Sequence, residues 1–456
     1  MATLESSPEK TTWSDALAVY LKPRVLIIIL LGFSAGLPLA LSGTTLAIWM
    51  TESGVNLRTI GLYALVDLPY TIKFLWAPLI DALDVPILSK ALGRRRGWLV
   101  FSQLLLIAAI LFLAFQNPSA VLWPVAFGAV LVAAASATQD IVIDAFRVES
   151  LETSEQAAGM AGYVAAYRIG MLASGAGVLA LAAWLAHIGV TAHAAWMWGY
   201  IGAAALMSVG LFATLLATEP PAPADATDKS RDPITRVALT AIGAFKEFLT
   251  RDMAIVVLLF VVLYKFCDAF AGVLTGPFVI DIGFDKATYA AIVKGVGLAA
   301  ALVGGFAGGA VARALPLSTS LWVGGILQLF SNLSFAALAL IGPNVPALTA
   351  TIIIENFCGA IGTVIFIAYL SALCGVRLHT ATQFALLTAL AAVGRTTLSS
   401  GGGFVAEATG WALFFVITSL AAIPSLVLLA WLQARGHFAA LDKAAQEKAA
   451  LDKKEV

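Results

Sequence analysis

Two arginines occupy matched positions in two long apolar stretches of the chain. One stretch runs from Thr382 to Gly403 and carries Arg395, and the other runs from Gln156 to Gly175 and carries Arg168. Each arginine follows a glutamine by twelve residues, and the two arginines are 227 positions apart, about half of the 456 residues. An arginine at the centre of a membrane helix costs about 2.5–3.5 kcal/mol, so it is expected to face protein or a water-filled cavity. This repeated buried cation indicates a transporter built from two related halves.

A lysine and an aspartate add to the charge at the same depth. Lys265 and Asp268 are spaced i,i+3 and share one face of an apolar helix, near the midplane where transporter substrates bind. Glu355 and Lys294 lie nearer the external side. We favour a functional role for the midplane groups, although each could instead be a structural ion pair that holds one conformation together.

A second group of charges lies toward the cytoplasmic ends of helices. Asp140 and Asp144 are spaced i,i+4 on one face, and Lys73 lies at a similar depth. For these three we favour a structural ion pair or a gating role. The gate is expected to combine opposite charges at the inner helix ends, namely Asp81, Arg94, Arg95, Arg96 and Asp144.

The elements that must position these groups are membrane helices. The chain is 60% hydrophobic and 12% charged with a mean hydropathy of +0.93, whereas soluble domains carry roughly 25% charge. A net charge of zero argues against a nucleic-acid partner. The three cysteines show no pairing or metal-ligand spacing, so we expect neither a metal nor another cofactor.

Apolar runs predict an all-α membrane protein of twelve transmembrane helices in two pseudo-symmetric six-helix bundles. The predicted spans are 25–50, 60–81, 97–116, 120–145, 157–187, 193–217, 253–281, 285–312, 317–341, 346–375, 380–408 and 411–433. The predicted divisions are a polar segment at 1–24, a first bundle at 25–217, a linker with a surface helix at 218–252, a second bundle at 253–433 and a tail at 434–456.

The distribution of lysine and arginine predicts the orientation. Twenty of the 27 basic residues fall in segments on one side, two fall on the other side and five lie inside helices. Because basic residues are enriched in cytoplasmic loops, both termini are expected in the cytoplasm. Leaving ten of the ionisable groups of the predicted helices in lipid would cost on the order of 25 kcal/mol, so these groups must be paired or hydrated.

Several motifs resemble known transporters. Asp81 followed by Gly93-Arg94-Arg95-Arg96 resembles the cytoplasmic loop signature of the major facilitator superfamily. Longer segments are together similar to the AmpG-type muropeptide permeases, relatives of the acetyl-CoA transporters. These segments are GFSAGLPLALSGTTLAIWM (Gly32–Met50), KFLWAPLID (Lys73–Asp81), GRRRGW (Gly93–Trp98), QDIVIDA (Gln139–Ala145), YKFCDAF (Tyr264–Phe270), ENFCGAIGT (Glu355–Thr363) and ATQFALLTALAAVGR (Ala381–Arg395).

The resemblance implies a function and a set of site residues. It implies proton-driven import of N-acetylglucosaminyl-anhydro-N-acetylmuramyl peptides across the bacterial inner membrane, by a protein that we expect to act as a monomer. We expect Arg168, Lys265, Arg395, Gln139 and Asn356 to bind substrate; of these, Gln139, Lys265 and Arg395 match polar positions of the family. Asp268 or Glu355 would carry the coupling proton, because a buried acid near a cation can take up a proton when ligand engages that cation.

Three alternatives remain open at this point. The chain could be an exporter, a carrier of another large anionic solute such as a CoA ester or conjugated sugar, or a membrane-embedded glycan-transferring enzyme. The four histidines lie scattered at helix ends and loops, which disfavours the enzyme.

Overall fold

All regular structure in the described part of the chain is helical. The computed structural model describes residues 18–55, 59, 63–221, 232–284, 288, 290–374, 379–399 and 401–452. This agrees with the predicted all-α fold class.

The first half of the chain, up to α13, contains long helices and several short ones. In chain order they are η1 (Val19–Leu21), α2 (Pro23–Ser42), α3 (Thr44–Glu52), η2 (Tyr63–Asp67), α5 (Leu68–Ile72), η3 (Lys73–Leu75), α6 (Ala77–Ala82), α7 (Leu88–Leu92), α8 (Arg94–Ala114), α9 (Leu122–Ser150), α10 (Thr153–Leu172), the π-helical η4 (Ala173–Gly177), α11 (Val178–His187), α12 (Ala192–Leu206) and α13 (Ser208–Leu216).

The second half follows a connecting helix, α14 (Pro233–Leu249). Its elements are α15 (Ala254–Tyr264), α16 (Phe266–Asp281), the π-helical η5 (Ala290–Val296), α18 (Gly297–Ala314), α19 (Leu317–Ile341), α20 (Val345–Leu373), α21 (Thr380–Ser399), α22 (Gly402–Thr409), α23 (Trp411–Leu420) and α24 (Ile423–Ala434), followed by a terminal helix α25 (His437–Asp452).

Ten of the twelve predicted spans are long and apolar enough to cross a membrane in the described residues. The second span is instead divided into η2, α5, η3 and α6, and prolines occupy the first turns of α5 and α6. Proline lacks the backbone N–H that would continue a helix from the preceding turn. The eleventh is interrupted between α21 and α22, and its apolar part covers Thr380–Ala392. Length and hydropathy therefore do not by themselves fix the count at twelve.

Glycines allow the closest helix contacts within each half. A Cβ added at Gly36 of α2 would lie 1.9 Å from the carbonyl oxygen of Tyr167 on α10. A Cβ at Gly304 of α18 would lie 2.3 Å from the carbonyl oxygen of Phe357 on α20. The glycine pattern in these helices therefore serves backbone packing, as small-xxx-small motifs do in membranes.

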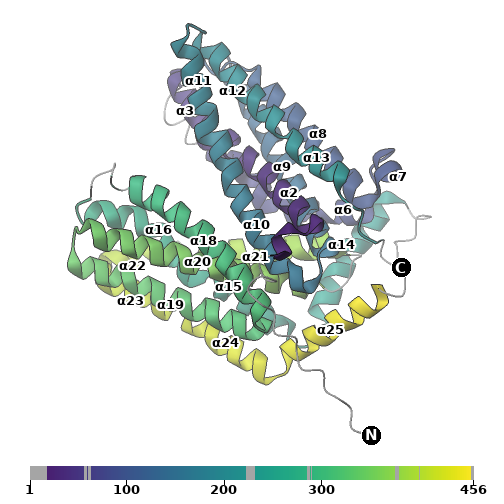
Figure 1. The fold of residues 1–456 in the computed structure, drawn as a ribbon, viewed down its shortest axis with the longest axis vertical. Coiled ribbons are helices and arrows are strands. Elements are labelled where there is room, and N and C mark those ends of the chain that lie inside the picture. The colour runs from purple at the N-terminus through teal and green to yellow at the C-terminus, as the bar shows by residue number, and fades with distance from the viewer. Residues whose placement is uncertain are drawn as a thin grey trace.

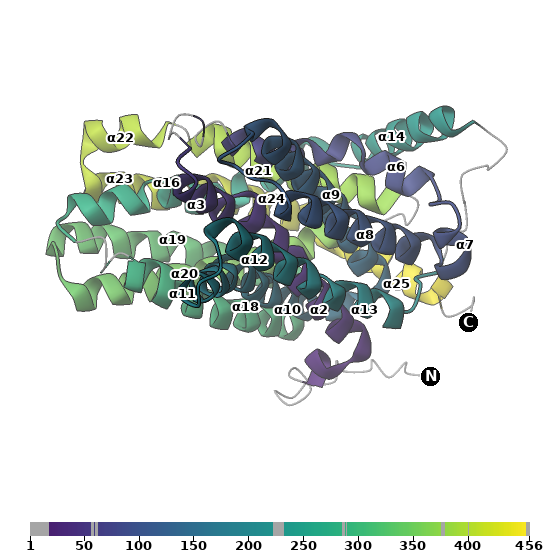
Figure 2. The same ribbon diagram turned by 90° about the horizontal axis from the view of Figure 1, so that it is seen from above.

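The two halves diverge from a shared end. Figure 1 shows the helices of the first half running up to α3, α11 and α12, while those of the second half run away to α16, α22 and α23. In Figure 2, α6, α7, α14 and α25 lie together at the opposite end of the molecule. There the small residues Ala157 and Ala161 of α10 are buried against Val364 and Ala368 of α20. We call this the closed end; the charge pattern predicts that it is cytoplasmic.

Candidate functional site

A cavity of about 310 Å³ is lined by both halves of the chain. Arg168 of α10 comes from the first half, and Glu355 and Asn356 of α20 come from the second. The other lining residues are Gly272, Thr275, Gly276, Val293 and Leu298. The Asn356 amide donates a hydrogen bond of 2.5 Å to Glu355 Oε2, and Arg168 lies close enough to Glu355 for electrostatic interaction. A forked cation therefore faces an acid and an amide across one small space.

Lys265 lies between α15 and α16, the two helices into which the seventh predicted span is divided. Its ammonium contacts the Asp268 carboxylate and donates to Gln328 Oε1 and the Gly359 carbonyl, both at 3.3 Å. Asp268 is in the first turn of α16, where a helix N-terminus stabilises negative charge. The structure thus brings the i,i+3 pair together, and it anchors the lysine to α19 and α20 as well.

Two further cations that the sequence predicts for this region are described by their backbone alone. Arg395 lies on α21 and Lys294 on η5, but their side chains are outside the described part of the structure. The prediction that Arg395 binds substrate therefore stays a prediction.

The two stretches that carry the matched arginines are also similar in the backbone that follows each arginine. The π-helical η4 begins five residues after Arg168, and the break between α21 and α22 occupies the corresponding place after Arg395. Glycines and other small residues follow both arginines, which lets the backbone leave regular α-helix there.

Several charged and polar residues of the first half lie on or next to α9, which corresponds to the fourth predicted span. Asp140 is partly buried, and its Oδ1 has no hydrogen-bond partner among the described residues. Lys73 and Asp144 lie near enough for electrostatic interaction with it. Gln139 is fully buried, and neither polar atom of its amide finds a partner in the described residues. The predicted group Lys73, Asp140 and Asp144 is thus assembled on one side of α9.

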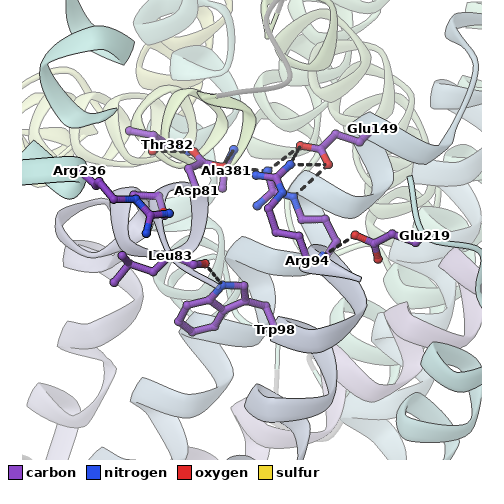
Figure 3. A network of polar contacts seen from close by, with 11 residues as sticks. Asp81, Leu83, Arg94, Trp98, Glu149, Glu219, Arg236, Ala381 and Thr382 are labelled. Atoms are coloured by element: carbon purple, nitrogen blue, oxygen red, sulfur yellow. Dashed lines mark hydrogen bonds and ion pairs between the residues drawn. The ribbon is translucent and has the colours of Figure 1, made fainter. Parts of the chain in front are cut away.

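A buried ion network seals the closed end within the first half (Figure 3). Arg95 Nη2 lies 2.8 Å from Asp81 Oδ1 and 2.5 Å from Glu149 Oε1. Arg94 is more distant, at 3.4 Å from Glu149 and 3.9 Å from Asp81. Arg95 is fully buried and Asp81 is 4% exposed, so this network holds charges that would otherwise be costly to dehydrate.

Asp81 also reaches across to the second half. Its Oδ2 accepts hydrogen bonds from the Thr382 backbone N–H at 2.8 Å and from the Thr382 hydroxyl at 2.7 Å. Its Oδ1 accepts from the Ala381 N–H at 3.3 Å. These donors belong to the first turn of α21, whose backbone N–H groups have no partner within the helix. A carboxylate of one half therefore caps a helix of the other half.

Two members of the predicted gate lie elsewhere. The Arg96 guanidinium donates to the carbonyls of Thr214 and Leu215, at 3.0 and 2.8 Å, and ties α8 to α13. Asp144 lies 3.7 Å from Arg147 and forms no ion pair with Arg94 or Arg95.

Sequence reasoning missed Arg147 and Glu149 because the fourth predicted span ended at residue 145. The corresponding helix, α9, continues to Ser150. The extra turn places both residues inside the protein. Arg147 is fully buried, and its Nη1 donates to Gln156 Oε1 and to Ser371 Oγ of the second half, both at 3.0 Å. Its guanidinium also lies 5.1 Å from the centre of the Phe384 ring on α21.

The connecting helix α14 forms hydrogen bonds with both halves at the closed end. Arg236 donates to the Ala82 carbonyl at the end of α6, and Glu247 Oε2 accepts from Gln383 of α21 at 2.8 Å. Before this helix, Glu219 accepts from the backbone N–H groups of Arg95 and Arg96 at 2.8 and 2.9 Å. Burial raises the pKa of the Glu219 carboxyl, and those two N–H donors oppose the rise.

Comparisons with known proteins agree with this arrangement. Residues 28–382 match the family model of the Major Facilitator Superfamily. The anhydromuropeptide permease of Escherichia coli K12 is 41% identical over 417 residues, covering 91% of this chain and 81% of that protein. Among solved structures, the transporter FucP in the outward conformation has a TM-score of 0.62 at 15% identity, covering 91% of this chain and 99% of that one. The human organic anion transporter MFSD10 has a TM-score of 0.60 at 16% identity, covering 93% and 100%.

Proposed function

Because this chain belongs to the Major Facilitator Superfamily, and within it to the AmpG-type permeases, we propose that it imports anhydro-muropeptides from periplasm to cytoplasm. It is a multi-pass membrane transporter and not an enzyme. The observation that carries the substrate proposal is the cavity that Arg168 of one half shares with Glu355 and Asn356 of the other. A ligand that bridges the two halves can bias how they move against each other.

The chemistry of the cavity suits the proposed ligand, an N-acetylglucosaminyl-anhydro-N-acetylmuramyl peptide. Its peptide carboxylates match the forked donors of Arg168, and Lys265 offers a second positive charge. Its sugar hydroxyls and acetamido groups match side-chain amides such as those of Asn356 and Gln139. Arg395 completes the proposed binding set through the internal repeat.

We propose alternating access because the two halves pack together at one end of the molecule and diverge toward the other. Hydrogen bonds and small-residue packing join the halves at the predicted cytoplasmic end, and the helices diverge toward the other end (Figure 1). This arrangement supports a state that loads substrate from the periplasm. Both termini are then cytoplasmic, the surrounding bilayer is the bacterial inner membrane, and the working unit is a monomer.

Proton symport is proposed from the charge of the ligand. Moving one negative charge into a negative cytoplasm costs about 2.3 kcal/mol per 100 mV, and co-transported protons offset that cost. Asp268 and Glu355 are the candidate acids in the second half. Asp268 contacts Lys265, so a ligand carboxylate that engages Lys265 would free Asp268 to take up a proton.

The test is uptake of radiolabelled anhydro-muropeptide into proteoliposomes, with and without an imposed proton gradient. We expect accumulation only with the gradient; accumulation of a CoA ester instead of the muropeptide would overturn the substrate proposal. Asp268→Asn and Glu355→Gln are then compared in gradient-driven uptake and in counterflow exchange. The coupling acid should lose the first activity and retain the second, and retention of both by both variants would remove these residues from coupling.

A further inference from the structure

One membrane-embedded carboxyl in the first half stands apart from the other described acids. Asp268 contacts Lys265, Glu355 accepts from Asn356, and Asp144 lies 3.7 Å from Arg147. Asp140 forms no ion pair or hydrogen bond with any described residue, and its Oδ1 is buried. Asp67 also lacks a partner among them, but its side chain is exposed and can be hydrated. A carboxylate oxygen sealed without a donor is costly when charged and much less so when protonated.

The surroundings of Asp140 suit a group that gains and loses a proton. Lys73 of η3 and Asp144 of α9 are the charges that face it. Phenol groups face it from Tyr70 of α5 and from two residues of α10, Tyr163 and Tyr167. Helix α21 also packs against α9 and carries Arg395, whose side chain lies outside the described part. Asp140 is only partly buried, so water can still reach its other oxygen.

The same face of α9 leads from Asp140 to the contact between the halves. Asp140, Asp144 and Arg147 are spaced i, i+4 and i+7, which places them in one row along the helix. Arg147 ends the row, donating to Ser371 Oγ of α20 at 3.0 Å and lying over the Phe384 ring of α21. Its Nε and Nη2 make no hydrogen bond with the described residues, so Asp144 supplies its countercharge.

We propose that Asp140 is a second proton-binding site of this transporter, and that Asp144 and Arg147 transmit its charge to the contact between the halves. The proposal rests on the proton symport proposed above and adds a titrating group in the first half. The step is reversible: the Asp140 carboxylate binds one proton from the periplasmic side and releases it to the cytoplasm, with no other bond changed.

The consequence for the gate follows from the balance of charge. With Asp140 ionised, two carboxylates share Lys73 and Arg147. Protonation of Asp140 leaves Lys73 free to turn toward Asp144, which weakens the Asp144–Arg147 interaction. Arg147 then holds Ser371 less firmly, and the closed end can open. Arg147 is a positioning residue in this scheme, since it touches neither proton nor substrate.

The test compares the wild type and Asp140→Asn in proteoliposomes, with Asp281→Asn as the matched control. Asp281 is a carboxyl at the far end of α16 that accepts a hydrogen bond from Trp411. We expect Asp140→Asn to lose at least tenfold in gradient-driven accumulation, to keep counterflow exchange and to lose the pH dependence of that exchange. Asp281→Asn should match the wild type in all three.

Each other result has a defined meaning. A wild type without gradient-driven uptake would refute the proton symport itself, whereas a coupled wild type with a fully coupled Asp140→Asn would refute only this inference. Loss of both accumulation and exchange at normal abundance would assign Asp140 a structural role. If Asp140→Asn does not reach the membrane, Asp140→Glu takes its place; the proposal then requires a shifted pH profile, and an unchanged profile overturns it.

Discussion

Among the described residues, Arg168 is the cation that lines the cavity. We predict that Arg168→Lys lowers the initial rate of muropeptide uptake by about 10- to 100-fold, because an ammonium cannot reproduce a forked, charge-assisted contact worth about 1.5–3 kcal/mol. The measurement is uptake per amount of protein in the membrane. Arg24→Lys is the control, since Arg24 forms a 3.8 Å pair with Glu152 at the surface and is 61% exposed. Equal rates in the two variants would remove Arg168 from the binding site.

Sequence reasoning at this scale was strongest for residues that are close in the chain. Lys265 and Asp268, three positions apart, do contact each other, although the predicted helix is broken at Lys265. Partners from other helices could not be foreseen, because hydropathy does not give the rotation of one helix against another. Arg168 of α10, across the cavity from Glu355 and Asn356 of α20, is an example.

Two adjacent glycines of α18 test the packing of elements. A Cβ at Gly304 would meet the Phe357 backbone at 2.3 Å, whereas a Cβ at Gly305 meets nothing within 4 Å. We predict that Gly304→Ala lowers the apparent melting temperature of the purified protein by several degrees, since overpacking costs about 1–3 kcal/mol. Gly305→Ala should leave the melting temperature unchanged or raise it slightly, because alanine favours helix over glycine by about 1 kcal/mol. Equal melting temperatures would contradict the close approach of α18 and α20.

A substitution of Asp81, whose carboxylate caps α21, tests the gate. We predict that Asp81→Asn shifts the protein toward a state open at the predicted cytoplasmic end, because an amide cannot neutralise Arg95 and stabilises the N-terminus of α21 less well. The readout is labelling of Val364→Cys, a buried position between the halves, in a background without the three native cysteines. Labelling should rise several-fold. Glu152→Gln removes an exposed pair with Arg24 and keeps an oxygen that can accept in the capping box of α10, so it should not raise the labelling.

The elements themselves were predicted in order but not in detail. Ten spans follow from long apolar runs. The division of helix two and the extension of helix four to Ser150 were not foreseen. Both depend on tertiary contacts: the last turn of α9 is polar, yet it is buried because Arg95 and Ser371 supply partners for Glu149 and Arg147.

At the scale of the whole molecule, transport requires the closed end to open. We predict that a disulfide between Ala161→Cys of α10 and Gly309→Cys of α18, whose Cβ atoms would lie 3.1 Å apart, abolishes uptake by joining the halves. Reduction should restore uptake. The matched control is Ala40→Cys with Gly175→Cys, at 3.8 Å within the first half, which should cross-link without blocking transport. Full uptake by the oxidised inter-half pair would exclude alternating access at this interface.

The sequence could predict two halves and an orientation, but not which end is closed. Every state of such a transporter buries the same apolar faces within each half, so the hydrophobic pattern is satisfied equally by all of them. Only contacts between the halves, such as Arg147 with Ser371 and Asp81 with Thr382, distinguish one state from another.

The carboxylate that caps α21 also links gate opening to local unfolding. An N-cap side chain contributes about 0.5–2 kcal/mol to a helix, and here it is supplied from the opposite half. When the halves separate, the first turn of α21 loses that contribution and its amides become free to exchange with solvent deuterium. Hydrogen exchange at Ala381 and Thr382 would then report the open population directly, with no label attached to the protein. Each transport cycle would fray and re-form one helix turn.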